Sequence, residues 1–357
     1  MSQLGECVSA VSKTLRRFSV YFLYTEILEA YRDAMNVLLR VPMPELTDVT
    51  LHELPIPTAL GQSYVLLSAC RILNLSLYQF DWITKEDLHG LLQSAGQLVK
   101  LLLTVPMQAR QDFTKRQEDT RLIMPNLREY TVNFSPYRAH ANSTLAFSFT
   151  APSLETLRIH VYGSIPTDEA RATICRMFEG FIHASAPRRL TTLHLRQGAV
   201  QAATRVLPLL PSLTTLHLSI DVHLVAVSGE QHALWRTVLA RLDEGPEEMV
   251  CPALETLFTG TWAFSSHLRL LQRVAQTRRQ GGRQIRRLAL AEWPSQTAET
   301  ALSELPSSAS QAYELEAALA DEVGELMIGE WRFDKEKRTW EKRSGGGEDA
   351  EEETFPM

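Results

Sequence analysis

Arginine and histidine recur at matching places in several leucine-containing segments of this chain, and both can bind anions. Arg158 and His160 belong to one such segment, His194 and Arg196 to the next, and His217 to a third. Guanidinium groups hold carboxylates and phosphates through charge-assisted, often paired hydrogen bonds. These residue types indicate a surface that binds an acidic or phosphorylated group.

Motifs of enzyme catalysis are missing from the sequence. There is no P-loop, no dinucleotide-binding glycine pattern, no zinc-protease motif and no nucleophile elbow. None of the ten histidines is spaced for metal ligation with a cysteine or an acid, and the four cysteines form no C-x-x-C pair. We therefore expect a protein that is not an enzyme and that holds no metal and no other cofactor. Sparse cysteines and no secretory signal predict free thiols in an intracellular location, cytoplasm or nucleus.

The elements that would position the basic residues follow from a repeated phrase, L-x-x-L-x-L with apolar substitutions. Successive copies start 23 to 41 residues apart, several of them within the 20–29 residues of leucine-rich repeats. In five copies a proline stands two residues before the first leucine, where it stops a preceding helix. The copies begin at Leu15, Leu46, Ile72, Leu98, Leu127, Leu154, Leu190, Leu213, Leu254 and Ile285.

Apolar residues spaced three or four apart predict helices between the copies. One such stripe is Leu88, Leu91 and Leu92, and others lie in 27–38, 174–181, 234–242 and 268–274. Each helix must bury its stripe against a strand and against neighbouring repeats. The fold class expected is α/β: an irregular leucine-rich-repeat solenoid, with a curved parallel sheet on its concave face and helices on its convex face.

The proline-led phrase with irregular helical spacers resembles the leucine-rich-repeat region of F-box proteins, particularly the large fungal sets. The resemblance covers about residues 10–300. It implies the substrate-recognition part of a ubiquitin ligase component, in which an N-terminal F-box docks on the ligase adaptor. Because the first phrase already begins at Leu15, we expect a truncated or divergent member without an F-box, and no docking on that adaptor.

In each phrase the leucines point into the core and the residues between them point to the opposite, concave face. The central concave residues are then Ser19, Thr50, Ser76, Leu102, Thr131, Arg158, His194, His217, Phe258 and Ala289. Neighbouring strands lie about 4.8 Å apart, so Arg158, His194 and His217 should form a contiguous ladder. The predicted binding residues are Arg158, His160, His194, Arg196, His217, Phe258 and Arg287. The alternative is that these side chains only solvate a wet sheet face.

A second basic cluster lies between Arg273 and Arg287 and includes Arg278, Arg279, Arg283 and Arg286. Nucleic-acid or anionic-lipid binding is the alternative function that this cluster indicates. Few aromatic residues interleave with it, which argues against single-stranded nucleic acid. Arginines at a helix C-terminus also complement the helix dipole, and this gives Arg278 and Arg279 a structural reading.

Composition is that of a globular protein: 357 residues, 45% hydrophobic and 22% charged. Five of the acids behind the net charge of −6 lie in 348–353, so the rest of the chain is nearly neutral. No apolar run is long enough to span a membrane. We expect a solenoid of about ten repeats over 1–305, a cap over 306–343 and a disordered acidic tail over 344–357. The cap would be a helix over 311–327 and a hairpin from strands 326–333 and 339–343, with Trp331 and Trp340 on its apolar face.

Overall fold

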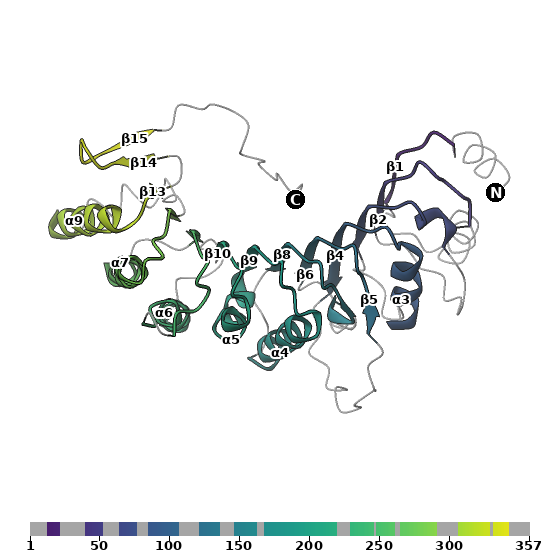
Figure 1. Cartoon of the computed structure of the whole chain (residues 1–357), viewed down its shortest axis with the longest axis horizontal. Helices are drawn as coiled ribbons and strands as arrows, with labels where there is room; N and C mark the ends of the chain where they lie inside the picture. The colour runs from purple at the N-terminus through teal and green to yellow at the C-terminus, as the bar shows by residue number, and fades with distance from the viewer. Residues whose placement is uncertain are drawn as a thin grey trace. The chain divides into compact units, whose positions relative to one another are not determined.

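The protein is an α/β chain with a large, mostly parallel sheet, seen in a computed structural model (Figure 1). It divides into two compact units, Met1–Leu234 with Val250–Ala253, and Trp235–Met249 with Leu254–Met357. The structure describes residues 13–21, 40–52, 64–76, 85–106, 121–135, 146–162, 168–219, 229–245, 248–260, 265–290, 306–328 and 331–342. The early helix expected over 27–38 and the acidic tail over 344–357 lie outside these residues.

In the first unit eight parallel strands lie side by side in the order of the sequence. Their bounds are β1 (Arg17–Tyr21), β2 (Asp48–His52), β3 (Ile72–Ser76), β4 (Lys100–Pro106), β6 (Glu129–Ser135), β8 (Thr156–Val161), β9 (Thr192–Arg196) and β10 (Thr215–Ser219). The short strands β5 (Leu122–Ile123) and β7 (Phe149–Thr150) pair separately. Every strand of the eight-stranded sheet belongs to one predicted repeat.

The turn before each strand is held by one repeated hydrogen-bond pattern. The carbonyl oxygen of Thr191, for example, accepts the N–H groups of both Thr214 and Thr215, at 2.9 and 2.8 Å. The carbonyl of Glu155 does the same for Thr191 and Thr192, and the pattern holds at every junction from β1 to β10. One backbone carbonyl thus joins each repeat to the next, and at several junctions a threonine hydroxyl, such as that of Thr214, donates to the same carbonyl.

Repeat length decides how much helix separates two strands. The 36 residues from Leu154 to Leu190 contain α4 (Asp168–Ser185), whereas the 23 from Leu190 to Leu213 have room only for α5 (Ala203–Val206) between two 3-10 turns. Among the described residues, the other α-helix that lies wholly in this unit is α3 (Lys85–Ser94), whose Leu88, Leu91 and Leu92 are fully buried. The described helices of the unit lie on one side of its sheet (Figure 1).

The core of the first unit is the layer of side chains between the strands and these helices. The two inward residues of each strand from β2 to β10 are buried, as Leu157 and Ile159 are on β8. An aromatic cluster packs behind the middle strands and consists of Tyr130, Phe134, Phe147, Phe149, Phe178 and Phe181. The hydroxyl of Tyr130 donates to the carbonyl of Ala146, so this buried polar group is satisfied.

One predicted phrase is wrong by two residues. The structure places Leu73 and Leu75 of β3 in the core, with fully buried Cys70 at the first apolar position, whereas Ile72 is 41% exposed. The phrase therefore starts at Cys70, not at Ile72. Asn74 is consequently the central residue that pairs with Thr50, and Ser76 lies one row further along the same face.

The second unit contains three parallel strands followed by a hairpin. The strands β11 (Thr256–Thr259), β12 (Arg287–Leu290) and β13 (Glu325–Ile328) pair in order, and β14 (Trp331–Asp334) and β15 (Thr339–Lys342) are antiparallel. The described helices of this unit are α7 (Ser265–Gln280), α9 (Pro306–Glu322) and most of α6 (Gly229–Leu242). The expected apolar stripe of α7 is confirmed by the burial of Leu268, Leu271 and Val274.

The predicted C-terminal elements need three corrections. The helix expected over 311–327 ends at Glu322, because a further rung with Val323 and Leu326 buried follows it. The strand expected over 326–333 is two strands, β13 and β14, which pair antiparallel with each other, and β14 also pairs antiparallel with β15 as the expected hairpin. Trp331 is 41% exposed, and Phe333 is the buried aromatic residue of β14.

Candidate binding site on the sheet

The predicted ladder of Arg158, His194 and His217 exists in the first unit. Arg158 on β8 pairs in register with His194 on β9, and His194 pairs with His217 on β10. All three alternate with buried leucines or isoleucine, so they lie on the sheet face opposite the core, here named the ladder face.

The two histidines form a flat stack. Their ring centroids are 3.9 Å apart and the ring planes differ by 5°. The pKa of His194 is lowered to about 2. Burial is the largest cause, and the nearby His217, Arg158 and His160 lower it further. A neutral His194 can stack against His217 without charge repulsion, and each neutral imidazole has one donor and one acceptor.

Arg158 is the ladder's permanent cation and is already in contact with an acid. Its Nη1 lies 3.7 Å from Oε2 of Glu129 on β6, and that same oxygen lies 3.4 Å from Nζ of Lys100 on β4. Lys100, Glu129 and Arg158 thus carry a net charge of +1. A partner's carboxylate or phosphate would replace Glu129 at Arg158. Glu129 was not among the predicted binding residues, which apart from Phe258 are all arginines and histidines.

His160 and Arg196 form the next row along the ladder face, in register on β8 and β9. The guanidinium carbon of Arg196 lies 5.6 Å from the ring centroid of Tyr162, and the ring of His160 is perpendicular to that ring at 6.2 Å. This row continues through three buried polar residues, Asn133, Thr104 and Ser76. Tyr162 is a second residue that the sequence analysis did not identify.

The other two predicted binding residues belong to the second unit. Phe258 lies on β11, and Arg287 lies on β12. Arg287 contacts Glu325 at 3.6 Å, and its Nε and Nη2 reach Sδ of Met327 at 3.3 and 3.1 Å. The side chain of Arg287 is therefore held within its own unit, and neither residue is treated as part of the ladder.

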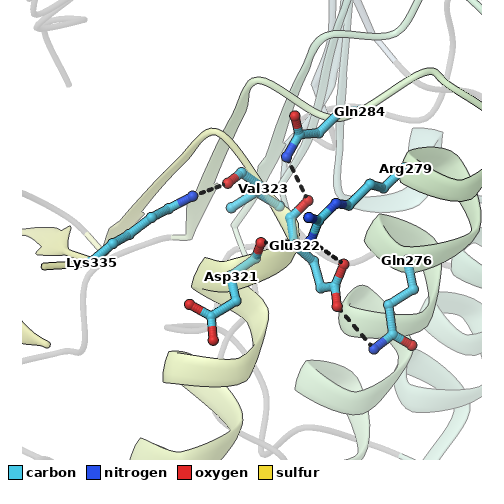
Figure 2. Close-up of polar contacts among 7 residues, drawn as sticks. All are labelled: Gln276, Arg279, Gln284, Asp321, Glu322, Val323 and Lys335. Atoms are coloured by element: carbon cyan, nitrogen blue, oxygen red, sulfur yellow. Dashed lines mark hydrogen bonds and ion pairs between the residues drawn. The ribbon is translucent and has the colours of Figure 1, made fainter.

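Most arginines of the cluster from 273 to 287 hold the second unit together. Arg273 pairs with the largely buried Asp243 at 2.7 Å, Arg286 with Glu255 at 3.3 Å, and Arg278 is fully buried. Figure 2 shows how Arg279 lies at the end of α9, where it contacts Oε2 of Glu322 at 3.2 Å and donates to the carbonyl of Asp321 at 3.1 Å. These contacts support the structural reading of the cluster.

Three more polar side chains form hydrogen bonds at the end of α9. Gln276 of α7 donates to Oε1 of Glu322, and Gln284 donates to the carbonyl of Glu322 (Figure 2). Lys335 of the hairpin donates to the carbonyl of Val323. Gln284 and Lys335 thereby satisfy carbonyl groups that a helix end leaves without intrahelical partners, whereas Gln276 holds the carboxylate of Glu322.

The described residues also bear on metal binding, disulfides and membrane-spanning helices. Among them, no group of three or more histidine, cysteine or acidic residues is close enough to hold a metal ion. Cys70, Cys175 and Cys251 are buried free thiols. None of the described helices is both long enough and apolar enough to cross a membrane.

No protein-family model matches this chain, and no curated protein matches it.

Proposed function

We propose that this chain is a protein-interaction module whose ladder face binds an acidic or phosphorylated segment of a partner protein. The observation that carries the proposal is the in-register row of Arg158, His194 and His217, with its flat imidazole stack. Packing of the sheet does not require Arg or His on this face, since β8, β9 and β10 are each already anchored by two buried inward leucine or isoleucine residues.

The ladder face combines three modes of recognition. Arg158 and Arg196 supply positive charge and planar hydrogen-bond donors for carboxylate or phosphate oxygens. The neutral imidazole of His194 adds directional hydrogen bonds, and its stack with His217 adds an aromatic surface. A segment lying across β8, β9 and β10 would meet each of these groups in turn, because adjacent strands are about 4.8 Å apart.

The finer architecture that we propose is an irregular leucine-rich-repeat solenoid. Each rung of the first unit from β2 to β10 has the buried first apolar residue, the shared carbonyl in the turn and two buried inward strand residues. Neighbouring repeats joined in this way form quasi-one-dimensional stacks with extended binding surfaces. Small-angle scattering tests this proposal: a radius of gyration close to that of a sphere of equal mass would contradict it.

An array of synthetic peptides, each in neutral, acidic and phosphorylated forms, tests the binding proposal. We expect acidic or phosphorylated forms to bind, and Arg158→Glu with Arg196→Glu to lower their affinity at least tenfold. Arg176→Glu is the matched control, because Arg176 lies exposed on α4, away from the ladder face. Equal loss in the control, or equal binding of the neutral peptides, would contradict the proposal. The ligase role that the F-box resemblance implies stays a prediction.

A further inference from the structure

A pocket lined by arginines lies at the edge of the first unit's sheet, in the turns where the strands begin. It is a pocket of about 340 Å³, lined by Arg71, Gln97, Val99, Pro125, Asn126, Arg128, Ser153 and Arg189. None of these residues belongs to the ladder. The volume falls at the lower end of the range of small-molecule pockets.

The three arginines reach the pocket from alternate rungs. Arg71 immediately precedes β3, Arg128 immediately precedes β6, and Arg189 lies in the turn before β9. The strands between them are β4 and β8, whose turns contribute Gln97 and Ser153. With about 4.8 Å per strand, neighbouring arginines start roughly 10 Å apart. A ligand that contacts all three must therefore be elongated.

The positive charge of this pocket is hardly neutralised by the protein. Among the described residues, the only carboxylate in contact with these arginines is Glu155, whose Oε1 lies 3.7 Å from Nη1 of Arg128. Both members of that pair are exposed, and exposed pairs stabilise by about 0–1 kcal/mol. The side chains of Arg71 and Arg189 make no hydrogen bond or ion pair with the described residues. Three like charges held around one pocket repel each other until an anion binds.

We propose that this pocket binds a small molecule carrying a chain of two or more phosphate groups. Guanidinium groups match phosphate oxygens through paired hydrogen bonds, and Gln97 and Ser153 add neutral donors between them. A single phosphate is matched by one or two guanidinium groups, whereas a linked series of phosphates can contact all three arginines. The site is separate from the ladder face and stands independently of the function proposed above.

Calorimetric titration of the full chain with inorganic tripolyphosphate tests this proposal. We expect saturable binding to one site that weakens as salt is raised from 50 to 200 mM. Arg71→Gln, Arg128→Gln and Arg189→Gln should each weaken binding about tenfold, as expected for losing a charged hydrogen bond. Arg188→Gln is the matched control, because Arg188 is exposed beside Arg189 but does not line the pocket.

Further outcomes separate the specific site from general charge attraction. The combined variant Arg158→Glu with Arg196→Glu removes the phosphate-binding arginines of the ladder face, so the tripolyphosphate binding that remains in it, and that is lost when Arg189→Gln is added, belongs to the pocket. Inorganic phosphate should bind at least tenfold more weakly than tripolyphosphate. The proposal is overturned if binding does not saturate, if Arg188→Gln weakens it as much as Arg189→Gln, or if a hexaglutamate peptide binds as tightly as tripolyphosphate. A thermal melt of each variant confirms that the exposed substitutions leave the protein folded.

Discussion

His194 and His217 stack face to face on adjacent strands, with ring centroids 3.9 Å apart and planes within 5° of parallel. The strand register brings their Cα atoms opposite each other, so both rings leave the sheet from equivalent positions. Such a stack is stable only while at least one ring stays neutral, because two stacked imidazolium ions would repel. The stack thus links the binding surface to pH.

Acid should destabilise the protein through His194. Its folded pKa, about 2, lies below the ordinary value of 6.5, so below pH 6.5 the unfolded chain binds the proton that the native protein does not. The contribution of His194 to the free energy of unfolding is therefore fully present above pH 6.5. It is lost as pH falls towards 2, at up to about 1.4 kcal/mol per pH unit. Urea unfolding at pH 7 and pH 5 should show a smaller pH dependence for His194→Gln than for the wild type. Equal pH dependence would contradict this assignment.

Removal of the Glu129 carboxylate should strengthen the binding of acidic peptides. Glu129 contacts Arg158 at 3.7 Å, and a partner's acid would have to displace it. Because both side chains are partly exposed, we expect Glu129→Gln to raise affinity only a few-fold. Glu155→Gln is the control, since Glu155 pairs with Arg128 outside the ladder face. Weaker peptide binding by Glu129→Gln would count against a site at Arg158.

Cys70 should resist thiol reagents while the protein is folded. Its side chain is fully buried, and burial raises the pKa of the thiol to about 12, so almost no reactive thiolate exists at pH 8. Mass spectrometry after iodoacetamide treatment should find Cys70 alkylated in urea but not in buffer. Rapid alkylation in buffer would place Cys70 outside the core and undo the corrected register of β3.

A methyl group at Gly324 should destabilise the second unit. A Cβ atom there would lie 2.4 Å from the carbonyl oxygen of Arg286, in the backbone contact that joins β13 to β12. Relief of that clash requires backbone movement, for which we expect a cost of about 1–3 kcal/mol in Gly324→Ala. Gly245→Ala is the matched control, because no atom lies within 4 Å of the Cβ it would add. Equal unfolding midpoints in a urea titration would be the contrary result.

Leucine spacing was enough to locate most of the strands, because the inward residues of a strand must be apolar and alternate. It failed at β3, where Ile72 and Leu77 imitate the phrase and buried Cys70 hides the true start. It also missed the rung at Val323 and Leu326, where the predicted helix ran on to residue 327. The first apolar position of this rung is Val323 and not leucine, and Gly324 follows it, so the repeated leucine phrase could not be recognised there.

The ladder itself could be predicted from the sequence, because in-register parallel strands bring equivalent positions together. The charged and aromatic contacts of the ladder residues could not be predicted in this way. The contact of Glu129 with Arg158 depends on a neighbouring row, and the stack of His194 on His217 depends on side-chain rotamers. The arginine pocket was also missed, because the sequence analysis looked for binding residues on the strands of each phrase and not in the turn that opens it, where Arg128 lies.

The imidazole signals of His194 and His217 in NMR spectra of histidine-labelled protein test the central proposal most directly. Titration with an acidic or phosphorylated peptide that binds in the array should shift both signals in step with saturation. His183, exposed on α4, should not shift. A peptide that saturates the protein and leaves the signals of His194 and His217 unchanged would contradict binding on the ladder face.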